Sequence, residues 1–225
     1  MYEAAFARLA EKNLLYPCFC SRNELHAASA PHLADGQVLY AGACRNLTPA
    51  EIAEKSKTRR PAWRVKVPDE TIAFMDRHLG AQRQNLAHEC GDFILRRSDG
   101  VFAYQLAVVV DDAAMEVSEV VRGQDLLSST ARQIWLYRTL GLPAPAFAHA
   151  PLLLAADGRR LSKRDGDVSL EQLQQRYTPE QIIGKLGWLC GLQPAPDARR
   201  PEELIEGFSW EKVPRGDICI PEGVF

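Results

Sequence analysis

The segment at residues 159–164, Arg-Arg-Leu-Ser-Lys-Arg, places four basic side chains directly after a turn-forming Asp157-Gly158 pair. Because Asp-Gly favours a tight turn, residues 152–155 and 160–161 are predicted to form the arms of a short hairpin. Lys163 would follow that hairpin, and a lysine is a compact charge on a flexible stem, suited to following charge between phosphate oxygens. The loop could therefore close on a polyphosphate, and the alternative is a solvated basic surface.

Cys18 and Cys20, together with Cys44 beyond a loop, have the residue type and spacing of metal ligands. Zinc prefers four ligands in a tetrahedron, and these thiols would supply three of them. On residue type alone the fourth ligand is expected to be His26 or His32, because imidazole is the commoner partner of thiolates. The alternative interpretation is three free thiols packed in the interior.

An α/β fold is indicated by the middle of the chain. Residues 104–112, Tyr-Gln-Leu-Ala-Val-Val-Val-Asp-Asp, are apolar and β-branched in their centre, which is typical of a strand buried on both faces of a parallel sheet. A second strand is predicted over 116–121, and residues 128–130 are predicted to cap a helix that continues through Leu140. Strand, polar tip and capped helix make half of a βαβ pattern.

Polar residues follow both predicted strands. Ligands of open α/β sheets bind beyond the carboxyl ends of the strands, where Asp111, Asp112 and Arg122 are expected to lie. Arg122 could bind an anion there. The alternative is a structural ion pair of Arg122 with Asp112 or Asp125.

Four blocks of this chain resemble, in order and spacing, the second half of the catalytic domain of class I glutamyl-tRNA synthetases, which has a Rossmann-type fold: residues 104–112, 121–125, 149–152 and 161–164. Leu161-Ser162-Lys163-Arg164 is similar to the Lys-Met-Ser-Lys-Ser signature of that class. The resemblance implies ATP-dependent activation of L-glutamate, with Mg²⁺ accompanying ATP. It also implies that Tyr104 and Arg122 hold the amino acid and that Lys163 is the catalytic residue that meets ATP.

Too few residues follow Lys163 for the large anticodon-binding region of a discriminating glutamyl-tRNA synthetase, so the chain resembles the shortened glutamyl-Q tRNA(Asp) synthetase family. That family attaches glutamate to the queuosine base of tRNA(Asp), which implies tRNA(Asp), L-glutamate and ATP as partners. Its pattern, Cys-x-Cys followed by Tyr-x-x-x-Cys, is matched by Cys18, Cys20, Tyr40 and Cys44. The resemblance thus implies Tyr40 as the fourth ligand of one structural Zn²⁺, with His26 held in reserve.

Composition is that of a globular enzyme, with 225 residues, 46% hydrophobic and 25% charged. No apolar run reaches the ~18 residues that a membrane span needs, so no membrane association is expected. Six cysteines without a secretion signal indicate reduced thiols and a cytoplasmic protein. The net charge of −2 argues against indiscriminate coating of nucleic acid, although the basic stretches 55–60 and 159–164 could contact tRNA.

The chain is divided by its patterns into four regions: 1–17, the end of a first Rossmann half; 18–100, a zinc-bearing insertion; 101–160, the second Rossmann half; and 161–225, the signature loop and a helical segment that contacts the tRNA stem by resemblance. Helices are predicted over 2–15 and from Thr48, which is capped through Glu51. A short strand is predicted over 63–67. Beyond Ser169 the pattern is helical and predicts these buried positions: Leu170, Leu173, Ile182, Ile183, Leu186 and Leu189.

The chain departs from the synthetase pattern at its front. A class I synthetase begins with a strand and a helix that carry His-Ile-Gly-His or a close variant, and no such motif occurs here. We therefore expect a chain that lacks its amino-terminal part and is inactive alone. Two alternatives are a fragment of a discriminating glutamyl-tRNA synthetase and a non-catalytic tRNA-binding remnant.

Overall fold

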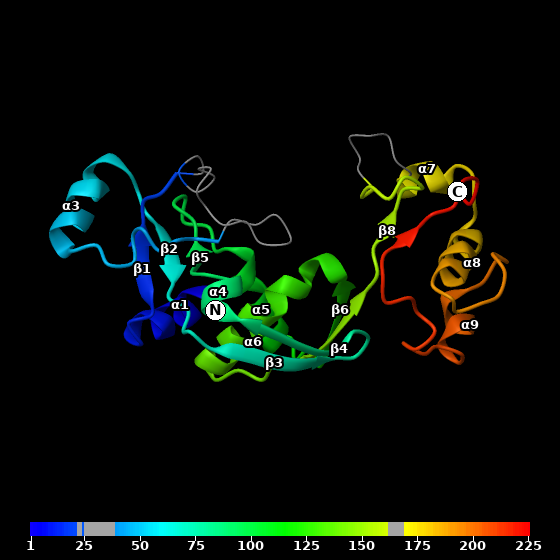
Figure 1. Ribbon diagram of the computed structural model, residues 1–225, viewed down its shortest axis with the longest axis horizontal. Helices are drawn as coiled ribbons and strands as arrows, with labels where there is room; N and C mark the ends of the chain where they lie inside the picture. Colours follow the sequence, from blue (N-terminus) through cyan, green and yellow to red (C-terminus); the bar gives the residue numbers. More distant parts are fainter. Residues whose placement is uncertain (22–23, 25–38, 162–168) are drawn as a thin grey trace. The chain divides into compact units, whose positions relative to one another are not determined.

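The computed structural model describes residues 1–21, 24, 39–161 and 169–225 (Figure 1). The chain divides into two compact units. The first unit combines Met1–Asp76, Ala81–Val120 and Leu126–Phe147, and the second combines Arg77–Gly80, Val121–Asp125 and Ala148–Phe225. Each unit combines several separate segments of the chain and therefore cannot be compared directly with the four consecutive regions predicted from the sequence. Those regions stay a prediction.

One part of the first unit is a three-stranded antiparallel sheet in the order β1-β2-β5, with β1 at Leu15–Cys18, β2 at Ala62–Val65 and β5 at Phe93–Arg96. The predicted strand over 63–67 corresponds to β2. Helix α3 (Pro49–Thr58) begins as predicted, because Thr48 and Glu51 form a reciprocal capping box at its amino terminus. Figure 1 shows β1 in blue and α3 in cyan, both within the first unit.

A helical layer packs with side chains of β2, β5 and β3 (Thr71–Asp76) to form the core of the first unit. It consists of α1 (Tyr2–Glu11), α5 (Tyr104–Ala114) and α6 (Leu127–Leu140). The predicted strand over 104–112 is wrong, because these residues form α5. Leu106, Val109 and Val110 are buried in the core, and with Ala113 they follow the i, i+3, i+4, i+7 spacing of a helix face.

The prediction that Asp111 and Asp112 lie at the end of a strand is wrong for the same reason, because both residues belong to α5. Asp111 accepts a hydrogen bond from the hydroxyl of Tyr2 at 2.7 Å. The predicted cap at residues 128–130 is also wrong. Helix α6 has Leu126 at its N-cap with no side-chain cap, and it ends at Leu140 as predicted, with Gly141 in the left-handed region at φ 64°.

A second sheet has the strand order β4-β3-β7-β6, with β3 at Thr71–Asp76, β4 at Gly80–Asn85, β6 at Glu119–Gly123 and β7 at Ala146–Ala150. Strands β3 and β7 are parallel. The strand predicted over 116–121 exists but lies later, as β6, so that Arg122 lies within it. A 3₁₀ turn, η1 (Gln124–Leu126), leads from β6 to α6, and a short helix, α4 (Leu86–Glu89), follows β4.

The second unit contains the predicted hairpin in outline. Leu154 bridges Arg160 in antiparallel fashion across the Asp157-Gly158 turn, and β8 (Leu153–Leu154) also pairs in parallel with β9 (Ile218–Cys219). Three helices follow as predicted: α7 (Leu170–Gln174), α8 (Pro179–Leu189) and α9 (Pro201–Ile205). Ile182 is buried, whereas Leu170 is 58% exposed and was wrongly predicted to be buried. Leu173, Ile183, Leu186 and Leu189 are half-buried.

Candidate functional site

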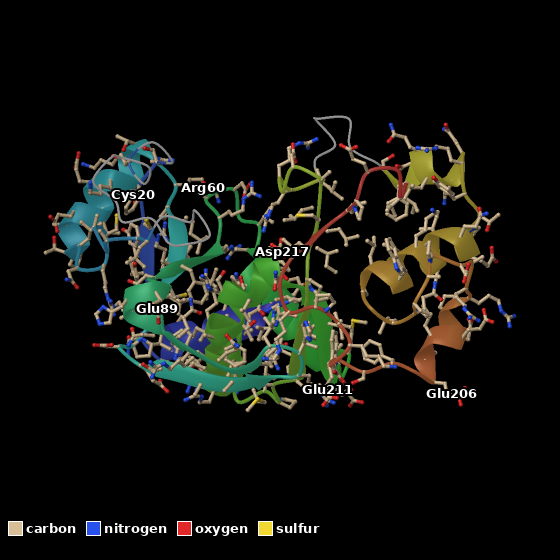
Figure 2. All side chains as sticks on the ribbon, turned by 45° about the vertical axis from the view of Figure 1, so that its right-hand side comes forward. Cys20, Arg60, Glu89, Glu206, Glu211 and Asp217 are labelled. Atoms are coloured by element: carbon tan, nitrogen blue, oxygen red, sulfur yellow. The ribbon has the colours of Figure 1, made fainter. Side chains whose placement is uncertain are left out.

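The cysteine cluster, defined here as Cys18, Cys20, Cys44 and Tyr40, lies in the first unit. The three Sγ atoms all lie within 4.8 Å of one another. The Tyr40 hydroxyl lies 3.5 Å from Sγ of Cys18 and 3.7 Å from Sγ of Cys20, and Cys20 and Cys44 have their Sγ atoms 3.6 Å apart. Figure 2 labels Cys20 beside α3 and the three-stranded sheet.

These separations fit a tetrahedral zinc site. With Zn–S near 2.3 Å and Zn–O near 2.0–2.2 Å, neighbouring ligand atoms of a tetrahedron lie about 3.5–3.8 Å apart. The three separations given above, 3.5 and 3.7 Å between sulfur and oxygen and 3.6 Å between Cys20 and Cys44, have that length. His26 and His32 lie outside the described residues, and the Tyr40 hydroxyl is the oxygen that the described structure places beside the cysteines.

Local structure explains why these side chains meet. The strand β1 alternates, and Tyr16 and Cys18 are its two buried side chains. Beyond β1, the backbone N–H of Phe19 donates to Sγ of Cys44 at 3.5 Å. Gly42, at φ 80°, supplies a left-handed turn residue between Tyr40 and Cys44, and the Tyr40 hydroxyl accepts from the Cys44 N–H at 2.8 Å. The spacing Tyr-x-x-x-Cys thus closes a compact loop.

Arg64 is a charged side chain that contacts the cysteine cluster. This buried side chain donates from Nε to Sγ of Cys18 at 3.2 Å, and its guanidinium lies 3.9 Å over the Tyr40 ring. Burial raises the pKa of the Cys18 thiol, but hydrogen bonds with Tyr40 and Arg64 outweigh it, so that this pKa lies below its ordinary value. Burial raises the pKa of Cys20 to about 12. The surroundings thus favour the thiolate at Cys18.

Sequence reasoning missed Arg64. Its guanidinium also donates from Nη1 to the Asp92 carbonyl oxygen at 2.8 Å, while the buried Asp92 carboxylate accepts from Val67 N–H and from the Tyr16 hydroxyl. The available signal was an arginine inside the apolar strand pattern, which is rarely buried without partners.

Arg122 lies on β6 in the second unit. Its Nε donates to Nε2 of His149 at 3.0 Å, and His149, on β7, is fully buried. The ion pair that the structure describes for Asp125 is with Arg160, at 3.8 Å. The sequence blocks 121–125 and 149–152 are therefore neighbours in space as well as parts of one resemblance.

Asp217 forms hydrogen bonds with both sequence blocks, 121–125 and 149–152. Its Oδ1 accepts from the backbone N–H of Leu152 at 2.9 Å and from the side-chain amide of Gln124. A Cβ on Gly123 would lie 2.7 Å from the carboxylate of Asp125 and 3.0 Å from a methyl of Leu152, so these side-chain ends would have to shift. Figure 2 labels Asp217 on the segment that leads into β9. The block around Arg122 is thus closely packed within the second unit.

Tyr104 is the first residue of α5 in the first unit, and its side chain is 50% exposed. The next side chain, Gln105, donates to Ser129 at 3.0 Å and accepts from Gln133 at 2.8 Å, which fixes the start of the helix on α6. Tyr104 is therefore held at a firm helix end with its ring accessible. Lys163 lies outside the described residues.

Comparison with known proteins gives consistent results. The family model of class I tRNA synthetases (E and Q), catalytic domain, matches residues 1–213. A glutamyl-Q tRNA(Asp) synthetase from Symbiobacterium thermophilum is 51% identical, with 98% of this chain and 69% of that protein aligned. One from Nitratidesulfovibrio vulgaris is 46% identical, with 96% of this chain and 68% of that protein aligned.

Solved structures show the same fold. The crystal structure of glutamate-tRNA synthetase from Elizabethkingia anophelis aligns with a TM-score of 0.77 and 25% identity, covering 99% of this chain and 51% of that one. The chain thus spans about half the length of this larger protein. Among the described residues, no helix is long and apolar enough to cross a membrane. The chain belongs to the class I tRNA synthetase family, whose members are ligases, in the branch of the glutamyl-Q tRNA(Asp) synthetases.

Proposed function

We propose that the protein activates L-glutamate with ATP and transfers it to the queuosine base of tRNA(Asp). The observation that carries this proposal is the 51% identity to a glutamyl-Q tRNA(Asp) synthetase across 98% of the chain. A ligase that acts on tRNA would work in the cytoplasm, which is where we place it.

The proposed reaction has two steps. A carboxylate oxygen of glutamate attacks the α-phosphorus of ATP, the bond from that phosphorus to the bridging oxygen breaks, and pyrophosphate leaves, with Mg²⁺ accompanying the phosphates. The glutamyl group then passes from the adenylate to the queuosine base, and AMP leaves. In such displacements a protein contributes chiefly by positioning the reactants and by stabilising developing charge.

We assign Tyr104 and Arg122 to glutamate and Lys163 to ATP. The accessible ring of Tyr104 and the guanidinium of Arg122 are suited to an amino acid with two carboxylates, because arginine pairs with carboxylates through charge-assisted hydrogen bonds. Lys163 would act by stabilising negative charge on the phosphates. These assignments follow the family's pattern, residue by residue.

We propose one structural Zn²⁺, held by Cys18, Cys20, Tyr40 and Cys44. The fit of the ligand separations to a tetrahedron supports this assignment. Four protein ligands leave no position open for a substrate, so the ion would supply stability to the loops around β1 and α3. Bound zinc would favour ionised thiols at all three cysteines.

Contact with tRNA is proposed for the exposed basic side chains of α3 and its following turn, which include Lys55, Lys57 and Arg60. Arg60 is labelled in Figure 2. Phosphate contacts of this kind give affinity without reading sequence. The helices α7, α8 and α9 are proposed, by the family's pattern, to contact the tRNA stem.

A second candidate is the ordinary charging of tRNA(Glu), which the structural similarity to glutamate-tRNA synthetase favours. The experiment that separates the two follows radioactive glutamate into purified tRNA(Asp) with and without queuosine, and into tRNA(Glu). Glutamate-dependent ATP–pyrophosphate exchange is measured in parallel, on the 225-residue chain and on a version extended upstream of Met1. Labelling confined to queuosine-containing tRNA(Asp) is expected. Labelling of tRNA(Glu) alone would establish the second candidate.

A further inference from the structure

The contact between Arg122 and His149 defines the protonation of a buried imidazole. His149 is fully buried, and its Nε2 lies 3.0 Å from Nε of Arg122 on the neighbouring strand. A guanidinium nitrogen donates and cannot accept, so Nε2 of His149 must present its lone pair. The imidazole is therefore neutral and carries its proton on Nδ1. Protonation of Nε2 would break the bond and place two positive charges side by side.

A neutral acceptor at this position matters for the charge of Arg122. A carboxylate at the position of His149 would also orient the guanidinium, but it would cancel the positive charge that an anionic ligand needs. A neutral imidazole orients the guanidinium and does not itself cancel its positive charge. Because Nε is committed to His149, a carboxylate bound by Arg122 must be met by the Nη nitrogens.

We propose that His149 is a positioning residue for glutamate binding: its Nε2 fixes the plane of the Arg122 guanidinium and directs the Nη edge toward a carboxylate of the substrate. This inference rests on the proposed role of Arg122 in holding glutamate. An arginine side chain has many rotamers and loses rotamer entropy when it binds a ligand. A bond that orders it beforehand reduces that cost when glutamate arrives.

A purely structural role for His149 predicts different behaviour. A cross-strand bond that only stabilised the sheet would, when removed, lower the unfolding temperature and affect both substrates or neither. A positioning role predicts a selective rise in the KM for glutamate, with the KM for ATP unchanged. It also predicts that the effect disappears when Arg122 itself is absent.

Three substitutions of His149 separate these roles. Gln places an amide oxygen near the position of Nε2, Asn reaches only as far as Nδ1, and Leu fills space without an acceptor. In the version extended upstream of Met1, we expect His149→Leu and His149→Asn to raise the KM for glutamate about tenfold or more in pyrophosphate exchange. His149→Gln should bring that KM back near its native value, because its amide oxygen can accept the charge-assisted hydrogen bond from Arg122. Equal KM values in all three variants and the native protein would overturn the inference.

A double variant of Arg122 and His149 provides a second test. In an Arg122→Ala background, His149→Leu should cause no further rise in the KM for glutamate, whereas additive effects would show that His149 acts by another route. If Arg122→Ala leaves the KM for glutamate unchanged, the proposed role of Arg122 fails, and with it the basis of the inference. Nitrogen-15 NMR of the labelled imidazole gives a readout without activity. A proton on Nδ1 is expected, and a proton on Nε2 would contradict the proposed bond.

Discussion

Arg64 on β2 donates a hydrogen bond from Nε to Sγ of Cys18 on β1 at 3.2 Å, and both side chains are buried. In the register of the two strands Arg64 is opposite Tyr16, so its side chain reaches diagonally to Cys18. A zinc ion with three thiolates and a neutral phenol carries a net charge of about −1. Arg64 would supply the balancing charge if the proposed ion is bound.

Removing that charge should weaken zinc binding. We expect Arg64→Met to lower the zinc affinity by about 10–100-fold, as loss of an outer-shell partner does in other zinc sites. Arg64→Lys should fall between Arg64→Met and the native protein, because the ammonium keeps the charge but cannot bond Cys18 and Asp92 in the same fork. Competition with a chromogenic chelator measures the affinity. A folded Arg64→Met variant that binds zinc with the native affinity would show that Arg64 does not contribute to zinc binding.

The identity of the fourth ligand can be tested by a matched pair. Tyr40→Phe keeps the ring and the packing but loses the oxygen, and it should lower the zinc affinity while His26→Ala leaves it unchanged. Cys44→Ser should lose stoichiometric zinc, measured as metal per chain in the purified protein. A lower zinc affinity in His26→Ala, with native affinity in Tyr40→Phe, would assign the fourth ligand to His26 instead. Full zinc in both Cys44→Ser and Cys18→Ser would rule out the site.

Local rules predicted much of the first unit. Thr48 and Glu51 fix the start of α3 because a capping box needs only residues three apart. The convergence of Cys18, Cys20 and Cys44 followed from residue type and spacing. The capping box and the Cys18–Cys20 spacing depend on short stretches of chain, whose conformation the sequence nearby largely determines, whereas Cys44 comes from beyond a loop.

The errors arose where propensity and periodicity disagreed. Three consecutive valines favoured a strand over 104–112, but the spacing of Leu106, Val109 and Val110 matches a helix face that packs in the core. The roles of Arg64 and His149 could not be predicted, because each depends on which residue lies on the neighbouring strand. Cross-strand register is a tertiary property.

Helix α8 offers a test of packing in the second unit. A Cβ on Gly184 would lie 1.8 Å from the carbonyl oxygen of Asp197, whereas one on Gly187 would lie 3.1 Å from a flexible methyl of Leu204. Gly184→Ala should therefore lower the free energy of unfolding by about 1–3 kcal/mol, despite the helix propensity of alanine. Gly187→Ala is the control in the same helix and should change it less. Chemical denaturation followed by circular dichroism compares them, and a stability ranking in the opposite order would contradict the close approach.

In the version extended upstream of Met1, substitutions of Lys163 and of Arg122 should impair glutamate activation in different ways, because the proposed partners of the two side chains differ. Lys163→Ala should lower the turnover of adenylate formation by about 100-fold or more, since one aimed electrostatic donor to the developing charge is lost. Arg122→Ala should chiefly raise the KM for glutamate and leave ATP binding unchanged, since its guanidinium is assigned to a carboxylate. Steady-state pyrophosphate exchange at varied glutamate and varied ATP measures both. Equal losses for both substrates in both variants, with lowered unfolding temperatures, would indicate a folding defect and not these roles.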